Sequence, residues 1–165
     1  LDRKKQKAYL EKLSYRDILT GLYNRNRYIE RLEAYKQVQD QQIGAIYIDL
    51  NGLKKVNDEQ GHRAGDELIV RAAGTIAGIF AEDAYRVGGD EFVVILLDVS
   101  REDFARKTEQ LRRQMQENSV DASIGGVWQA STENLENLLR RADENMYREK
   151  KRYYSQADAA QKPES

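Results

Sequence analysis

The sequence predicts an α+β fold, in which helices pack against a central, mostly antiparallel β-sheet. Two apolar runs carry this prediction: residues 43–50 and 92–97 have the length of strands and apolar side chains on both faces, as buried strands do. Around them, apolar residues recur at helical spacing. The predicted order is strand, helix, helix, strand, strand, helix, strand, which gives a sheet covered by helices.

Composition limits the class of protein. The 165 residues suffice for one domain with a sizeable core, and 27 Lys and Arg against 28 Asp and Glu argue against a nucleic-acid polymer as partner. The absence of cysteine excludes disulfides and thiolate metal sites. No apolar run approaches the roughly 20 residues of a membrane helix, so we expect no membrane contact by this domain itself.

The two ends of the chain differ from its body. Residues 1–13 are polar and favour helix, so we expect a linker helix leading in from an upstream sensor domain. Because the chain begins at Leu1 without a signal-like segment, we expect a fragment of a cytoplasmic protein, whose full-length form would carry any membrane anchor upstream. Residues 14–154 form the predicted domain, and residues 155–165 are expected to be disordered.

The first half of the domain places a carboxylate at a strand end. Asn24 is expected to cap a helix that runs through Tyr35. Asp49 ends the apolar run 43–50, and a carboxylate at the mouth of a buried strand is typical of a sheet edge that opens onto a ligand site. After a short helix beginning near Leu53, we expect Gly65 to turn the chain and Asp66 to cap the next helix.

A β-hairpin is predicted around Gly88 and Gly89. Strand-like runs lie on both sides, and glycine supplies the positive φ that a primed turn needs. Asp90 and Glu91 follow at once, where their charges repel and where burial is costly unless a cation or hydrogen-bond donors compensate. By itself this pentapeptide fits a solvated hairpin tip about as well as a metal site.

The last third continues the pattern. Ser100 and Asp103 form a capping pair for a helix, and residues 120–128 are expected to form a strand. The apolar positions of the two remaining helices are expected to face the core: Phe104, Thr108, Leu111 and Met115 in the first, and Leu135, Leu138, Leu139, Ala142 and Met146 in the second.

The predicted strand ends bring Asp49 near Asp90 and Glu91. Converging oxygen ligands, without cysteine or a histidine cluster, suit Mg²⁺ or Mn²⁺ rather than zinc. Lys54 and Lys150 suit a polyphosphate. The single histidine, His62, stands beside a glycine turn and is expected to form a local hydrogen bond rather than to bind a metal. The residues alone therefore indicate a nucleotide-phosphate site.

Several motifs resemble one known family. Residues 88–92, Gly-Gly-Asp-Glu-Phe, match the signature that names the GGDEF family of diguanylate cyclases, and further segments resemble the family's motifs in the same order: residues 17–25, 49–58, 61–66, 123–125 and 142–150. Three departures are visible. Asn51 stands where the family has a second Asp, and Leu53 where it has Phe. The family often continues to Gly-Arg-Asn, whereas here Lys151, Arg152, Tyr153 and Tyr154 follow.

The resemblance implies a GGDEF, nucleotidyl-cyclase-like fold with a ferredoxin-like palm. It implies that two GTP molecules are condensed into cyclic di-GMP, with release of two pyrophosphates, between the two protomers of a homodimer. Two Mg²⁺ or Mn²⁺ ions per active site would be held by the carboxylates of Asp49 and Asp90 and by the carbonyl of Leu50. Asp90 and Glu91 would assist deprotonation of the attacking 3′-hydroxyl.

The remaining implied roles concern the substrate. Asn57 and Asp66 would read the guanine edge, with His62 beside them. Lys54 and Lys150 would neutralise the triphosphate. Gly88 and Gly89 would let the backbone approach the α-phosphate.

Two other functions fit parts of the sequence. A catalytically weak or inactive GGDEF domain, acting as a GTP-binding or partner-binding module, is kept open by the departures at Asn51 and Leu53 and by the missing Gly-Arg-Asn. An adenylate-type cyclase would need a base-reading pair other than Asn57 and Asp66. Relatives often carry an Arg-x-x-Asp site for product inhibition, whose positions here are Ile79 and Glu82, so we expect no inhibition through that site.

Overall fold

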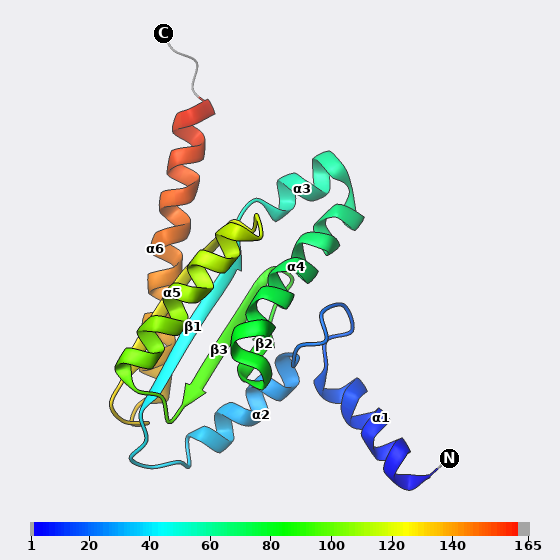
Figure 1. Cartoon of the computed structure of the whole chain (residues 1–165), viewed down its shortest axis with the longest axis vertical. Helices are drawn as coiled ribbons and strands as arrows, with labels where there is room; N and C mark the ends of the chain where they lie inside the picture. The colour runs from blue at the N-terminus through cyan, green and yellow to red at the C-terminus, as the bar shows by residue number, and fades with distance from the viewer. Residues whose placement is uncertain (1, 162–165) are drawn as a thin grey trace.

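The computed structural model describes residues 2–161 and contains a four-stranded antiparallel sheet (Figure 1). The strands are β1 (Ile43–Leu50), β2 (Ala84–Arg86), β3 (Glu91–Leu97) and β4 (Ala122–Gln129), in the order β2-β3-β1-β4. Every neighbouring pair is antiparallel. The predicted α+β class and the order of elements are confirmed.

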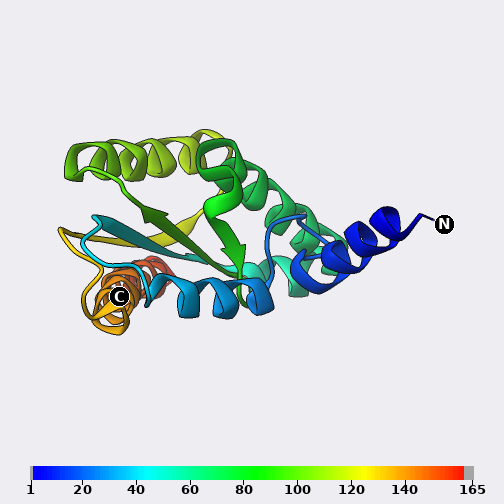
Figure 2. The same ribbon diagram turned by 90° about the horizontal axis from the view of Figure 1, so that it is seen from below.

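Helices cover both faces of the sheet (Figure 2). α4 (His62–Phe80) and α5 (Arg101–Glu117) lie on one face, whereas α2 (Arg25–Tyr35) and α6 (Leu135–Gln161) lie on the other. The remaining helical segments are α1 (Arg3–Tyr15), which projects from the body, α3 (Leu53–Gln60), at the end of β1, and a short 3₁₀ turn (Ala81–Asp83).

Alternation along the strands divides the apolar side chains between two cores. Ile46, Ile48 and Leu50 of β1 pack with α4 and α5, whereas Ile43 and Ala45 pack with α2 and α6. Because both faces of β1 and β3 are buried, these strands are apolar at almost every position.

Two predicted helix caps are confirmed. The side chain of Asn24 accepts a hydrogen bond from the backbone N–H of Arg27, and that of Ser100 accepts one from Asp103. The predicted capping role of Asp66 is wrong, because α4 begins at His62 and already includes Asp66. Gly61, with φ of 90°, makes the turn instead.

Gly65 lies inside α4 rather than at a turn. It is buried, and a Cβ added there would overlap the carboxamide of Asn57 on α3. Its lack of a side chain thus allows α3 and α4 to approach closely.

The predicted hairpin is confirmed, but its primed turn is wrong. Among the described glycines, positive φ occurs at Gly21, Gly52 and Gly61 and not at Gly88 or Gly89. β2 ends at Arg86 and β3 begins at Glu91, so the connection is longer than the two-residue loop that requires a primed turn. The N–H of Val87 donates to the carbonyl of Glu91 over 3.0 Å and closes this longer loop.

The expected disorder of residues 155–165 is wrong where the structure can test it. Residues 155–161 continue α6, and residues 162–165 lie outside the described part. Extending an existing helix avoids the cost of nucleation, and the alanines at 157, 159 and 160 favour helix. α6 consequently runs past the end of β1 (Figure 1).

A glycine in β4 sets the distance between the sheet and α6. A Cβ added to Gly125 would overlap the backbone of Ala142 and Met146, so α6 lies directly against the strand at this point. Lys150 is one helical turn beyond Met146. The close approach at Gly125 therefore determines where Lys150 lies relative to β1.

Gly125→Ala should lower the free energy of unfolding by about 1–3 kcal/mol, because α6 must move away from β4 to admit the methyl group. Urea unfolding monitored by circular dichroism would measure the change. Gly74→Ala is the matched control: Gly74 is exposed on α4 and an added Cβ meets nothing within 4 Å. Equal effects of the two substitutions would contradict the close-contact explanation.

Candidate active site

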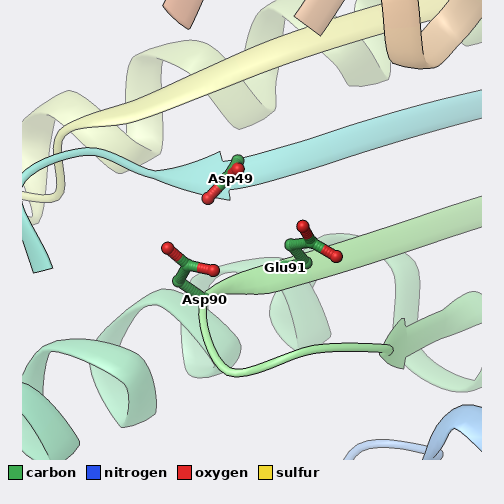
Figure 3. Close-up of side chains that lie close together, drawn as sticks. All are labelled: Asp49, Asp90 and Glu91. Atoms are coloured by element: carbon green, nitrogen blue, oxygen red, sulfur yellow. The ribbon is translucent and has the colours of Figure 1, made fainter. Parts of the chain in front are cut away.

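Three carboxylates meet where β1 ends and β3 begins (Figure 3). Asp49 is paired in register with Glu91, and one carboxylate oxygen of each of Asp49, Asp90 and Glu91 lies within 4.8 Å of the others. The N–H of Leu50 donates to the carbonyl of Asp90 over 3.0 Å and fixes the two backbones to one another. The predicted convergence of these three acids is therefore confirmed.

Lys150 joins this cluster from α6. Its ammonium lies 3.0 Å from Oδ1 of Asp49 and donates a hydrogen bond of 3.2 Å to the carbonyl of Leu50. The position relative to Asp49 is not aligned for a hydrogen bond, and no described residue donates one to this buried Oδ1. The ammonium thus compensates the charge of Asp49 but leaves the oxygen without a donor.

The surroundings of Asp49 fit a hard divalent cation. Asp49 is only 7% exposed. Burial raises the pKa of its carboxyl to about 6; the attraction of Lys150 opposes this rise, and the charge of Asp90 adds to it. A buried carboxylate oxygen without a donor, beside two more carboxylates and a backbone carbonyl, is an all-oxygen donor set of the kind that Mg²⁺ and Mn²⁺ prefer.

The loop that carries Asp90 is held by Arg86, which the sequence analysis did not single out. The guanidinium donates to the carbonyl of Gly89 over 2.8 Å and to both carboxylate oxygens of Asp17 over 3.1 and 3.2 Å. Burial would raise the pKa of Asp17, but hydrogen bonds from Thr20 and Arg86 outweigh it and hold this pKa below its usual value. The sequence offered one signal for this role, because Arg86 is the charged residue that ends the short apolar strand β2.

The other predicted substrate residues lie on α3 and α4, next to this end of the sheet. The carboxamide of Asn57 lies against Gly65, the residue before Asp66. His62, at the start of α4, and Asp66 are both exposed. Lys54 is exposed on the first turn of α3 and forms no hydrogen bond or ion pair with the described residues. The structure thus places Asn57 against the part of α4 that bears Asp66. Of the two predicted lysines, only Lys150 contacts the acidic cluster.

Comparison with known proteins identifies the family of this chain. The sequence model for "Diguanylate cyclase, GGDEF domain" matches residues 14–156. The chain belongs to the GGDEF family.

Curated relatives support the assignment, and a solved structure shares the fold. The diguanylate cyclase DgcS of Shewanella oneidensis is 33% identical over 147 residues, which cover 81% of this chain and 49% of DgcS. The uncharacterized protein YhcK of Bacillus subtilis is 33% identical over 153 residues, covering 81% of this chain and 42% of YhcK. The coiled coil and GGDEF domain of DgcB from Caulobacter crescentus shares the fold, with a TM-score of 0.81 at 23% identity over 90% of this chain and 86% of that one.

This GGDEF domain spans less than half the length of those two curated relatives. Between residues 2 and 161, no helix is both long enough and apolar enough to cross a membrane.

The departure at Asn51 has a local partner. Asn51 is 6% exposed; its amide donates to Oδ1 of Asp121 over 3.0 Å, and its Oδ1 accepts from Ser123 over 2.8 Å. Its backbone N–H donates to the carbonyl of Asp121 over 2.9 Å. Because a carboxylate at position 51 could not donate to Asp121, asparagine suits this chain better than the family's aspartate. Asn51 connects the loop after β1 to the start of β4.

The positions of the family's product-inhibition site have other roles in this GGDEF domain. Ile79 packs against the core, and Glu82 forms an ion pair of 2.6 Å with Arg16. Hydrogen bonds from Tyr23 and Arg16 hold the pKa of Glu82 below its usual value. This pair joins the segment after α1 to the domain.

Asn51→Asp should lower the free energy of unfolding by about 1–3 kcal/mol, because a carboxylate at the buried position 51 would face that of Asp121 where a hydrogen bond now exists. Urea unfolding at neutral pH would measure the loss. Adding Asp121→Asn should restore most of the stability, since the amide at 121 could then donate to the carboxylate at 51. A double variant no more stable than Asn51→Asp alone would show that this pair is not responsible.

Proposed function

We propose that this GGDEF domain is the catalytic part of a diguanylate cyclase, which condenses two GTP molecules into cyclic di-GMP and releases two pyrophosphates. The observation that carries the proposal is the intact signature at residues 88–92, whose acids lie against the buried carboxylate of Asp49. Relatives such as DgcS are diguanylate cyclases by name, and the chain covers about half of that protein.

Two Mg²⁺ or Mn²⁺ ions would be held by Asp49, Asp90 and the carbonyl of Leu50. The donors are oxygens, and the buried Oδ1 of Asp49 has no hydrogen-bond donor in the described structure. Bound there, the ions would polarise the attacking hydroxyl and stabilise the departing pyrophosphate.

The protein's own groups bind the phosphates and receive the proton. Asp90 and Glu91 assist removal of the single proton of the 3′-hydroxyl, and Lys54 and Lys150 neutralise the charge that develops on the triphosphate. Gly89 needs no positive φ, and an added Cβ would meet nothing within 4 Å. Because neither backbone conformation nor packing requires glycine at position 89, the open space there supports close approach of a substrate phosphate. Gly88 differs, because an added Cβ would come within 2.9 Å of the carboxylate of Glu91.

Guanine is read by Asn57 and Asp66, with His62 beside them. The N1–H and N2 amine of guanine need an acceptor, which the exposed carboxylate of Asp66 offers, and Asn57 adds a donor for O6. Adenine has the opposite polarity at the corresponding edge, so this pair favours GTP over ATP. Equal binding of ATP and GTP in a direct titration would remove both residues from the base site.

Asp90→Ala should abolish formation of cyclic di-GMP while leaving the fold intact, because it deletes a metal ligand and relieves repulsion among three acids. Chromatography of the products after incubation with GTP and Mg²⁺ would measure this. Glu109→Ala removes an acid from α5, outside the cluster, and serves as the charge-matched control. Near-normal turnover by Asp90→Ala would show that the site is assigned wrongly.

Catalysis should require two protomers, since each supplies one GTP to a product with two guanosine units. The rate per mole of protein should therefore rise with protein concentration until dimers saturate. Initial rates over a dilution series, with the mass of the species measured in parallel by light scattering, would test it. A constant specific activity in a sample shown to be monomeric would rule out the dimer.

Cyclic di-GMP should not bind at residues 79–82. Ile79 has no guanidinium to pair with guanine or phosphate, and Glu82, already paired with Arg16, would repel an anion. Calorimetric titration of Asp90→Ala with cyclic di-GMP would detect such a site apart from the active site. Binding that disappears on Glu82→Ala would contradict this expectation.

A further inference from the structure

We propose that the ammonium of Lys150 occupies the metal position of the nucleotide-free protein and must leave it before a divalent cation can bind. This inference rests on the metal site proposed above. It assigns Lys150 two successive positions: on the oxygens of Asp49 and Leu50 without substrate, and on the substrate phosphates afterwards.

The contacts of Lys150 are those expected of a substitute cation. It takes one carboxylate oxygen, at 3.0 Å, and one backbone carbonyl, at 3.2 Å. These are the two groups of β1 that would hold the metal. Among the described ion pairs, this is the one that reaches Asp49, Asp90 or Glu91. Without it, the buried charge of Asp49 would have no counter-charge.

The lysine and a metal ion exclude each other. Both are cations, both would use the same two oxygens, and the side chains involved are little exposed, so solvent screens their repulsion weakly. Displacement of the lysine by a divalent ion replaces one cation at Oδ1 of Asp49 by another, so the charge of this carboxylate stays compensated.

The exchange needs no movement of the backbone. α6 is held against β4 at Gly125. The ammonium of Lys150 stands at the end of a flexible four-carbon stem, so it can move by side-chain rotation alone. The ring of Tyr154, one turn further along α6, lies 5.7 Å from the ammonium and attracts it on the solvent side of the site. A bound triphosphate carries negative charge, so it would attract the ammonium more strongly than the neutral ring of Tyr154 does.

Binding of Mn²⁺ to the nucleotide-free protein tests the exchange without turnover. Lys150→Met should raise Mn²⁺ affinity by about 5-fold or more, the lower end of typical coupling between sites. Lys151→Met is the matched control, because it removes the same charge from the next residue, which lies over Tyr147. Electron paramagnetic resonance of unbound Mn²⁺ would give both dissociation constants.

Lys150→Gln guards against loss of structure, since its amide can still donate to the carbonyl of Leu50. It should raise Mn²⁺ affinity as Lys150→Met does. A non-hydrolysable GTP analogue should increase Mn²⁺ affinity more in the wild type and in Lys151→Met than in either Lys150 variant, because only the former can move an ammonium onto the phosphates.

Failure of the exchange can be told from failure of the proposed function. If Mn²⁺ binds the wild type, is lost in Asp90→Ala, and binds both Lys150 variants no more tightly than Lys151→Met, the exchange is wrong and the metal site stands. If no form binds Mn²⁺ with or without the analogue, both are wrong.

Discussion

The candidate active site depends on a carboxylate at the end of a buried strand. Asp49 follows a run of apolar residues in β1 and is itself only 7% exposed. A charge so placed is tolerated only when a cation or several donors compensate it. The contact with Lys150, the raised pKa of Asp49 and the suitability of the cluster for a divalent cation all follow from this burial.

Two backbone supports hold the groups that meet Asp49. At Gly125 the backbones of β4 and α6 touch, which places Lys150 at the end of β1. At Gly89 the carbonyl is held by Arg86, which also binds Asp17 in the segment after α1. The chemistry would take place on short side chains, but its geometry is set by a glycine and an arginine that need not touch the substrate.

Departures from the family pattern are accommodated by other residues of this chain. Asn51 is matched by Asp121, whose carboxylate accepts a hydrogen bond from the amide of Asn51. The segment that relatives end with Gly-Arg-Asn continues here as helix, and the hydroxyl of Tyr153 packs 3.3 Å from the point where a Cβ on Gly52 would lie. These contacts hold the loop after β1 against β4 and α6.

Local sequence determined the elements and most of the candidate site. Periodicity predicted the strands and helices, and the caps at Asn24 and Ser100 depend on neighbours within three residues, so both were predictable. Asp49, Asp90 and Glu91 stand at strand ends, which a sheet brings together. The family motifs identified the remaining candidates residue by residue.

Only the tertiary structure decided the contacts between distant segments. Whether Gly65 turns the chain or admits Asn57 depends on how α3 packs on α4, and the hairpin avoids positive φ because Arg86 and the longer loop support it. Lys150 reaches Asp49 because Gly125 brings α6 onto the sheet. Each of these outcomes depends on packing between elements far apart in sequence, for which local propensity carries no information.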